Sequence, residues 1–506
     1  MSTAERLRAA RPRAAEGEAA GAAALGEFGA LVAGERPKTG DAIDVRSPYD
    51  DAVVAVVHRA GPSEIEAAIA AAAEAFEETR KLPSWKRAEV LEAISTGIRE
   101  RRDDFVRTIA LEAGKPVKAA QVEVDRATFT FKVAAEEAKR IYGEVVPLDW
   151  LPGNERRVGY VRRVPLGPVT GITPFNFPLN LVAHKVAPAL AAGNPIIVRP
   201  SSQTPVAALK LGELVVETGW PEGAFSVVPS GTEAAKPLVE DDRLRMLSFT
   251  GSPAVGWSLK SQAGRKKVTL ELGSNSAVIV HRDADVSYAA ERVAWGGFVQ
   301  AGQSCIAVQR VYVHSDVHEA FREEFLARVR ALKVGDPLAE DTDVGPLIDD
   351  GAAERVTAWV DEAVEGGAEL LAGGGHDGRL WEPTVLTGLA DDMRVACDEV
   401  FAPVVGLWEY SDVREAIGAV GLGDYGLQAG IFTNDLELVE SVFADVEVGG
   451  IMVNEVPTFR VDHMPYGGVK QSGMGREGLR YAIEEMTELK LLAVNHRGGG
   501  KGVVGE

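Results

Sequence analysis

Cysteine is scarce in this sequence, with only 2 residues among 506. Two cysteines cannot build a disulfide framework, so we expect a reducing, cytoplasmic location. Basic residues are also outnumbered: 54 Lys and Arg stand against 75 Asp and Glu, which gives a net charge of −21. Because no block of Lys and Arg offsets that charge, nucleic acid and acidic membrane surfaces are excluded as expected partners.

Long unbroken apolar runs are missing as well. The most apolar region, residues 164–198, contains Lys185 and is interrupted by prolines, among them Pro165, Pro168, Pro174, Pro178 and Pro188. That pattern is typical of packed loops and helices and excludes a membrane span. The first 26 residues lack the continuous apolar core of a secretory signal. We expect residues 1–26 and 497–506 to be flexible segments.

What the sequence does contain is enough apolar material, 46%, for two or three domains. From residue 167 the short apolar runs GPVTGI, PIIVR and FSVV alternate with helical runs around 185–192 and 207–218. A second series begins near residue 277 with AVIV and continues with RVYVH. This alternation predicts an α/β fold with parallel sheets and crossover helices.

Two local patterns predict further elements. Residues 63–138 are rich in helical signals, and Ser63 followed by Glu66 is typical of a capping box at a helix start. The charged, alternating run RRVGYVRRV at 156–164 predicts a strand that reaches out of the body, towards a partner subunit.

Cys305 lies in the stretch FVQAGQSCIAVQR and has two interpretations. A lone cysteine is most often a buried structural thiol. A nucleophilic thiol would need a route to the thiolate, a base, and hydrogen-bond donors for an oxyanion. Glu271, between two leucines, is either a paired core charge or such a base. Asn176, between Pro174 and Pro178, is either an Asx-turn residue or such a donor.

Six short motifs occur in one order along the chain: FNFP at 175–178, ELG at 271–273, GQSC at 302–305, EVFAP at 399–403, PYGGVK at 465–470 and SGMGRE at 472–477. In order and spacing they resemble the aldehyde dehydrogenase superfamily, over roughly residues 27–493. The runs PFNFPLNLVAHK, ELGSNS and VPTFRVDHMPYGGVK are most similar to the lactaldehyde, non-phosphorylating glyceraldehyde-3-phosphate and phosphonoacetaldehyde dehydrogenases.

The resemblance implies an aldehyde dehydrogenase-like fold in three parts. Residues 27–147 and 167–273 would form a Rossmann-like dinucleotide-binding domain, and residues 274–475 an α/β catalytic domain. Residues 148–166 and 476–496 would form a small β oligomerisation arm, which implies a homodimer or homotetramer.

The resemblance also assigns chemistry. Cys305 would attack an aldehyde carbon, and the Asn176 amide with the backbone N–H of Cys305 would hold the resulting oxyanion. After hydride transfer to a nicotinamide cofactor, Glu271 would activate the water that hydrolyses the thioester on Cys305. Lys185 would support this centre.

The cofactor contacts implied by the resemblance are Thr173, Pro174, Arg199, Ser202, Gly231, Phe249, Gly251, Ser252, Gly273, Glu399 and Phe401. Residues 199–202 read Arg-Pro-Ser-Ser, where the family usually has Lys-Pro-Ser-Glu. A glutamate there would repel a 2′-phosphate, whereas Arg199 offers a guanidinium fork that suits one. NADP is therefore the expected cofactor, with NAD possible. Ser274 replaces the second glycine of the usual ELGG, without a functional explanation from sequence.

The substrate expected from the resemblance is a small polar or anionic aldehyde, contacted by Phe177, His184, Ser304 and Arg460. His184 could equally be a packed polar residue, and Arg460 could pair with Asp462 or Glu455.

Two other functions stay open. A CoA-acylating dehydrogenase generally lacks the base at the Glu271 position, and a non-catalytic scaffold protein tends to lose the nucleophile or the oxyanion donor. No metal is expected, because His314 and His318 lack the glutamate of a zinc-hydrolase motif and should be surface residues. Cys397 matches no motif and is expected to be a small buried hydrophobe.

Overall fold

The computed structural model describes residues 24–421 and 423–496, so the predictions for residues 1–23 and 497–506 lie outside the described part of the chain. The first described strand, β1 (Gly26–Phe28), pairs in parallel with β3 (Val53–His58). β3 also pairs with β2 (Ala42–Arg46), which gives a small three-stranded sheet.

The first large sheet has six strands in the order β22-β10-β9-β6-β7-β8. Its parallel strands are β6 (Val169–Ile172), β7 (Ile196–Arg199), β8 (Phe225–Val227), β9 (Met246–Thr250) and β10 (Lys267–Glu271). The short antiparallel strand β22 (Gly473–Met474) closes one edge. The connections include α6 (Asn180–Ala192), α7 (Val206–Glu217), α8 (Lys236–Glu240) and α9 (Pro253–Gln262). The predicted parallel sheet with crossover helices is confirmed.

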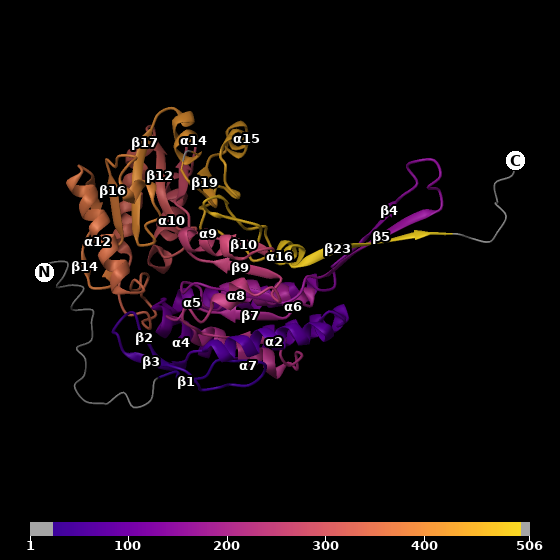
Figure 1. Ribbon diagram of the computed structural model, residues 1–506. Helices are drawn as coiled ribbons and strands as arrows, with labels where there is room; N and C mark the ends of the chain where they lie inside the picture. Colours follow the sequence, from indigo (N-terminus) through magenta and orange to yellow (C-terminus); the bar gives the residue numbers. More distant parts are fainter. Residues whose placement is uncertain (1–23, 422, 497–506) are drawn as a thin grey trace.

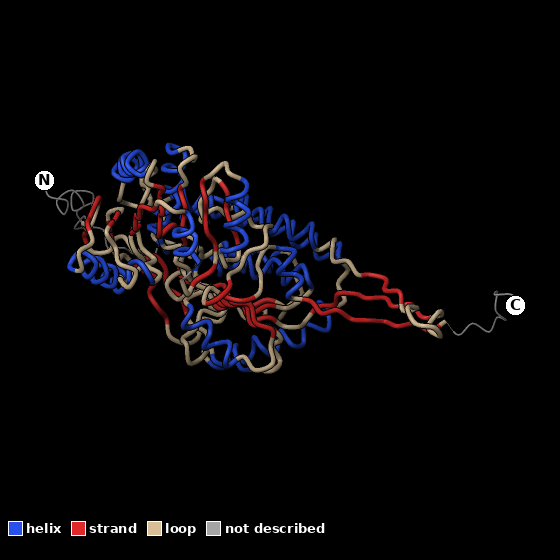
Figure 2. The backbone as a smooth tube through the Cα atoms, turned by 90° about the horizontal axis from the view of Figure 1, so that it is seen from above, coloured by secondary structure: helices blue, strands red, loops and turns tan. Residues whose placement is uncertain are grey.

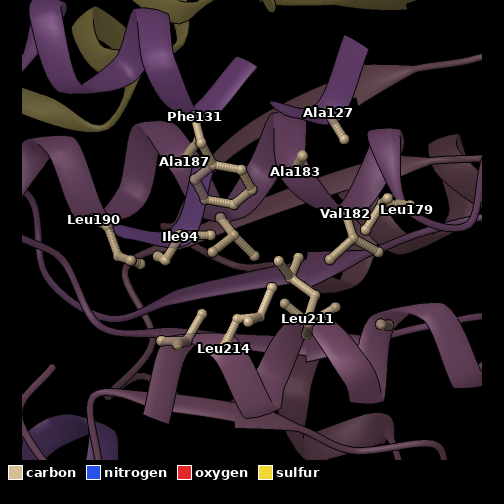
Figure 3. Packing of buried hydrophobic residues seen from close by; sticks show 14 of the residues in the cluster. Ile94, Ala127, Phe131, Leu179, Val182, Ala183, Ala187, Leu190, Leu211 and Leu214 are labelled. Atoms are coloured by element: carbon tan, nitrogen blue, oxygen red, sulfur yellow. The ribbon is translucent and has the colours of Figure 1, made fainter. Parts of the chain in front are cut away.

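Four N-terminal helices pack beside this sheet: α2 (Pro62–Thr79), α3 (Ser84–Glu100), α4 (Arg102–Ala113) and α5 (Val117–Glu137). Their shared core with α6 and α7 includes Ile94, Phe131, Leu190 and Leu214 (Figure 3). The predicted capping box is displaced. The backbone N–H of Gly61 donates to Glu64 Oε2 at 2.9 Å, because the helix begins one residue before Ser63.

The second large sheet has seven strands in the order β13-β16-β17-β12-β11-β19-β20. They are β11 (Ser276–Val280), β12 (Val308–His314), β13 (Glu369–Ala372), β16 (Thr384–Thr387), β17 (Val404–Tyr410), β19 (Gln428–Phe432) and β20 (Gly450–Val453). Their helices are α10 (Val286–Phe298), α11 (His318–Ala331), α12 (Asp350–Glu365), α13 (Arg394–Cys397), α14 (Val413–Gly421) and α15 (Leu436–Asp445). All pairings except β13 with β16 are parallel, which confirms the second predicted α/β series.

A thin three-stranded sheet, called the arm below, projects away from the body (Figures 1 and 2). It consists of β4 (Glu144–Pro147), β5 (Arg157–Pro165) and β23 (Thr487–Asn495), with β5 in the middle. The predicted outreaching strand is therefore present as β5. Helix α16 (Leu479–Glu485) leads from the body into β23. Among the described helices, none combines the length and the hydropathy needed to cross a membrane.

Candidate active site

A cavity of about 810 Å³ is bordered by loops that follow strands of the first sheet and by segments around the second sheet. Twelve of the site residues predicted from sequence line it: Pro174, Asn176, Phe177, Gly251, Ser252, Glu271, Gly273, Ser304, Cys305, Glu399, Phe401 and Arg460. Seven do not: Thr173, His184, Lys185, Arg199, Ser202, Gly231 and Phe249.

Cys305 reaches the cavity through a tight turn. Gln300, Ala301 and Gly302 have positive φ angles of 58°, 53° and 65°. A Cβ at Gly302 would lie 2.2 Å from the carbonyl oxygen of Ala402, so only glycine fits this position. The turn ends the η1 helix (Val299–Gly302) and delivers the thiol just before β12 begins.

Asn176 is tied to the same turn. Its side-chain amide donates to the carbonyl of Gln303 at 2.9 Å, and the Gln300 amide donates to the carbonyl of Asn176 at 3.1 Å. Asn176 Oδ1 is buried and has no hydrogen-bond partner among residues 24–421 and 423–496. Two hydrogen bonds therefore join the loop after β6 to the loop that carries the thiol.

The Cys305 sulfur lies 3.0 Å from the hydroxyl oxygen of Tyr466. The guanidinium of Arg460 lies over the Tyr466 ring, 3.5 Å from its centre. Burial raises the pKa of the Cys305 thiol to about 12, while the Tyr466 hydrogen bond and the charge of Arg460 lower it. Tyr466 was not predicted as a site residue, because the contact joins positions 161 apart, which motif spacing does not reveal.

Glu271 ends β10 and is buried. Within the described part of the chain, neither of its carboxylate oxygens has a hydrogen-bond partner. Burial and the nearby charge of Glu477 raise the pKa of Glu271 well above its usual value, and the opposing charges of Arg460 and Lys185 are smaller effects. A carboxyl group with a raised pKa holds a proton more strongly than a solvated one and is therefore a stronger base when ionised.

Glu477 is the centre of a buried charge cluster. Its carboxylate accepts from Lys185 at 3.2 Å and from Arg460 at 2.9 Å, and it lies 3.1 Å from His184 Nδ1. Burial raises the pKa of Glu477, but Lys185 and His184 outweigh burial and hold it far below its usual value. Glu477 was another residue that the sequence did not single out for the site.

His184 and Lys185 therefore lie behind the cavity wall. His184 Nε2 also contacts Asp462 at 2.7 Å, and Lys185 also donates to Ser248 and Thr250 at 3.0 and 2.8 Å. Arg460 forms its ion pair with Glu477, and the two partners suggested by the sequence, Asp462 and Glu455, pair elsewhere. Asp462 instead pairs with Arg126 at 2.7 Å, and Glu455 with Arg292 at 2.8 Å.

Three buried polar atoms at the carboxyl ends of β6, β7 and β8 have no hydrogen-bond partner within the described ranges: Thr173 Oγ1, Arg199 Nε and Ser230 Oγ. Arg199 is the last residue of β7, and the other two follow their strands. Arg199 Nη2 donates to the carbonyl of Ser230 at 3.0 Å, and Ser202 is exposed nearby in sequence. Open α/β sheets bind dinucleotides at this carboxyl edge, so unsatisfied polar groups there fit such a ligand.

The turn between β9 and α9 also fits a phosphate group. A Cβ at Gly251 would lie 2.5 Å from the Phe249 ring, and one at Gly256 would lie 2.4 Å from Leu272. Glycine thus allows close packing at the N-terminus of α9, where backbone N–H groups favour anions. Ser252 is the residue that precedes this helix.

Glu399 is held next to Gly273. Its carboxylate accepts from the backbone N–H of Ser274 at 3.0 Å, and a Cβ on Gly273 would lie 2.1 Å from Glu399 Oε2. Burial raises the pKa of Glu399 to about 7. Phe401, at a positive φ of 51°, packs edge-on against Phe175. The structure gives Ser274 a backbone role, while its hydroxyl lies 3.2 Å from that of Ser276.

Three predictions outside the cavity are wrong or changed. Cys397 is exposed at the end of the short helix α13, so it is not a buried hydrophobe. His314 is buried and packs edge-on against His281 and Tyr410, so it is not a surface residue. His318 is half-buried. The described residues contain no group of three or more His, Cys, Asp or Glu placed to hold a metal ion.

Comparison with known proteins gives consistent matches over nearly the whole chain. The family described as "Aldehyde dehydrogenase family" matches residues 36–492. A 3-sulfolactaldehyde dehydrogenase of Priestia aryabhattai is 45% identical over 93% of this chain and 98% of its own length.

Two solved structures are similar in fold and sequence. Aldehyde dehydrogenase 21 from Physcomitrella patens, in complex with the reaction product succinate, has a TM-score of 0.92 and 43% identity over 94% of this chain and 99% of its own. The glyceraldehyde-3-phosphate dehydrogenase GapN from Methanocaldococcus jannaschii, complexed with NADP, has a TM-score of 0.87 and 38% identity over 90% and 99%.

Proposed function

This chain belongs to the aldehyde dehydrogenase family and is an oxidoreductase, and on that premise we propose that it oxidises a small anionic aldehyde to its carboxylic acid, with NADP as the preferred cofactor. The observation that carries the proposal is the meeting of a thiol, an amide donor and an unpartnered carboxyl group, Cys305, Asn176 and Glu271, at one cavity.

The first step is carried by Cys305 and Asn176. The sulfur attacks the aldehyde carbon, and the carbonyl oxygen becomes an oxyanion within reach of donors fixed by the turn at 300–303. The Asn176 amide and the backbone N–H of Cys305 hold that oxyanion. Loss of one such donor typically costs ~2.7–4 kcal/mol of transition-state stabilisation.

Arg199, Thr173, the Gly251–Ser252 turn and Glu399 would hold the cofactor, since they supply a guanidinium fork, unsatisfied polar groups and a close glycine approach. When bound, a nicotinamide dinucleotide supplies the two-electron acceptor that turns a thiohemiacetal into a thioester. The preference for NADP rests on Arg199 together with the missing carboxylate at Ser202.

Glu271 completes the reaction as a base. It takes a proton from the water that attacks the thioester on Cys305, and the acid leaves as the thiolate re-forms. The negative charge of Glu477 keeps the proton affinity of Glu271 high, while Arg460 and Lys185 keep its ionised form accessible. Lys185 does not line the cavity. It pairs with Glu477 and influences Glu271 through its charge.

An anionic substrate is supported by the cations in the cavity wall and by the relatives. Arg126, Arg460, Lys115 and Lys118 all line the cavity. In the part of the chain that is described, the buried Nε of Arg460 has no hydrogen-bond partner. Sulfolactaldehyde, glyceraldehyde 3-phosphate and the succinate product named for the three relatives all carry an anionic group. His184, which the sequence suggested as a substrate contact, has a positioning role in this proposal, through its contact with Glu477.

The arm supports assembly as a homodimer or homotetramer. β23 forms one outer edge of its sheet, and Leu489, Leu491 and Leu492 on that strand are exposed. An edge strand with exposed leucines is a surface that oligomers commonly cover. A cytoplasmic location belongs to the same proposal, because the thiol must stay reduced.

A panel of aldehydes tests the proposal. Sulfolactaldehyde, succinate semialdehyde, glyceraldehyde 3-phosphate and uncharged lactaldehyde are supplied with NADP or NAD, and the acid is measured by mass spectrometry. We expect anionic aldehydes with NADP to give the highest kcat/KM and Cys305→Ala to give no acid. Acyl-CoA formation on adding CoA would favour the acylating alternative, and a Cys305→Ala protein with full biological function would favour the scaffold.

A further inference from the structure

Tyr466 occupies a fixed position beside the nucleophile. Its side chain is buried, and its backbone is locked by two hydrogen bonds with Glu477: the Tyr466 N–H donates at 3.1 Å, and the Glu477 N–H donates back at 2.6 Å. Glu477 is itself held by ion pairs to Lys185 and Arg460. The backbone of Tyr466 is therefore anchored to this buried cluster, next to Cys305.

Part of the surroundings of the sulfur is apolar. Cys305 packs against Ile306, Leu427 and the Tyr466 ring. An ionised sulfur in such a place is costly unless a donor faces it. Among residues 24–421 and 423–496, the side chain that hydrogen-bonds to the Cys305 sulfur is that of Tyr466, at 3.0 Å.

When Cys305 is ionised, the phenol is the donor in this pair, because a thiolate has no hydrogen to give. Burial and the neighbouring Cys305 raise the pKa of the Tyr466 hydroxyl well above its usual value, so the hydroxyl keeps its hydrogen. The guanidinium of Arg460, 3.5 Å from the ring centre, draws electron density from the ring face and strengthens the hydroxyl as a donor.

We propose that Tyr466 is a further catalytic residue, which donates its hydroxyl hydrogen to the thiolate of Cys305 and stabilises the nucleophile before the aldehyde arrives. Its role differs from that of Asn176, whose donor is directed at the oxyanion formed later. The inference rests on the proposed function only in taking Cys305 as the nucleophile.

The test removes the hydroxyl and keeps the ring, in Tyr466→Phe. Cys397 is exposed and would also react, so every protein carries Cys397→Ser. Iodoacetamide then reports on Cys305 alone: the S–H proton goes to buffer, the thiolate forms the S–C bond, and iodide leaves. The matched control is Tyr410→Phe, which removes a buried hydroxyl bonded to His281, away from the cavity lining.

We expect Tyr466→Phe to slow alkylation of Cys305 at pH 7.5 by about tenfold to a hundredfold, the effect of a lost charge-assisted hydrogen bond. Tyr410→Phe should match the parent. The thiolate absorbance at 240 nm, taken as the difference from the Cys305→Ala counterpart of each protein, should appear at higher pH in Tyr466→Phe. Unchanged NADPH binding and circular dichroism would show that the fold is intact.

Equal alkylation rates in parent and Tyr466→Phe would overturn the proposal. Slower alkylation with an unchanged thiolate titration would also overturn it, because Tyr466 would then act by packing alone. Neither measurement needs an aldehyde, so failure of the proposed substrate class or cofactor preference would be seen separately, in the aldehyde panel.

Discussion

Replacement of Glu271 by glutamine tests the assignment of the base most directly. The change keeps the shape of the side chain and removes its proton affinity. Because neither carboxylate oxygen has a hydrogen-bond partner in the described structure, no hydrogen bond to the described residues is lost. Glu477 cannot substitute as the base, since Lys185 and His184 hold its pKa far below the usual range.

The expected loss of turnover in Glu271→Gln is that of a missing general base. A positioned general base contributes about 10²–10⁴-fold, so steady-state turnover should fall by this factor, equivalent to ~2.7–5.5 kcal/mol. The steps before hydrolysis do not need the base. The first turnover should therefore still release about one equivalent of NADPH per Cys305.

Stopped-flow absorbance at 340 nm measures the burst, and intact mass spectrometry measures the acyl group left on Cys305. Hydroxylamine, which attacks thioesters without a base, should restore turnover. Glu455→Gln is the matched control, because Glu455 pairs with Arg292 and does not line the cavity.

The pH dependence has a defined sign. Glu271 works only when ionised, and its pKa lies well above the usual value. Wild-type turnover should be full above that pKa and decline as the pH falls through it, whereas the glutamine variant should lack this limb. Wild-type steady-state turnover in the variant, or a loss of the burst without accumulated acyl-enzyme, would refute the assignment of the base.

Four further predictions address the cofactor, the substrate, the charge cluster and the arm. Ser202→Glu should reverse the cofactor preference by at least about tenfold in kcat/KM, because a carboxylate repels the 2′-phosphate; an unchanged NADP to NAD ratio would contradict the role of this loop. Arg126→Ala should raise KM for anionic aldehydes and leave that for lactaldehyde unchanged; an equal effect on both would remove Arg126 from substrate recognition. Glu477→Gln should lower the unfolding free energy by about 3–5 kcal/mol, measured by urea titration, because it leaves Lys185 and Arg460 buried with their partner gone; a change below about 1 kcal/mol would show that the cluster is not held by charge. Leu491→Glu on the exposed face of β23 should shift the protein towards smaller species in sedimentation velocity, and an unchanged sedimentation coefficient would place the interface elsewhere.

Local patterns were sufficient for much of the fold. The runs at β6, β7 and β8 are short, buried and separated by helical segments, so each could be recognised without tertiary information. Motif order was sufficient for Cys305, Asn176 and Glu271, which the structure brings to one cavity.

Other parts of the site depend on contacts that sequence does not encode locally. Every residue of α6 is buried, so no polar face distinguishes the side chains directed at the cavity from those behind it. His184 therefore looked like a cavity residue and instead contacts Glu477 and Asp462. Tyr466 and Glu477 belong to sequence motifs, but the sequence did not assign them a role in the site. Their partners, Cys305 and Lys185, lie 161 and 292 positions away.

The cluster around Glu477 constrains how this sequence can diverge. Neutralising one charge leaves an opposite charge unpaired in the interior. Evolution to a different arrangement therefore requires substitutions at several of these positions almost together. We expect Lys185, His184, Arg460, Asp462 and Glu477 to be inherited as a block. Positions outside this block should vary more freely. Substrate range would then change through residues at the cavity mouth, while the charged residues behind Glu271 stay the same.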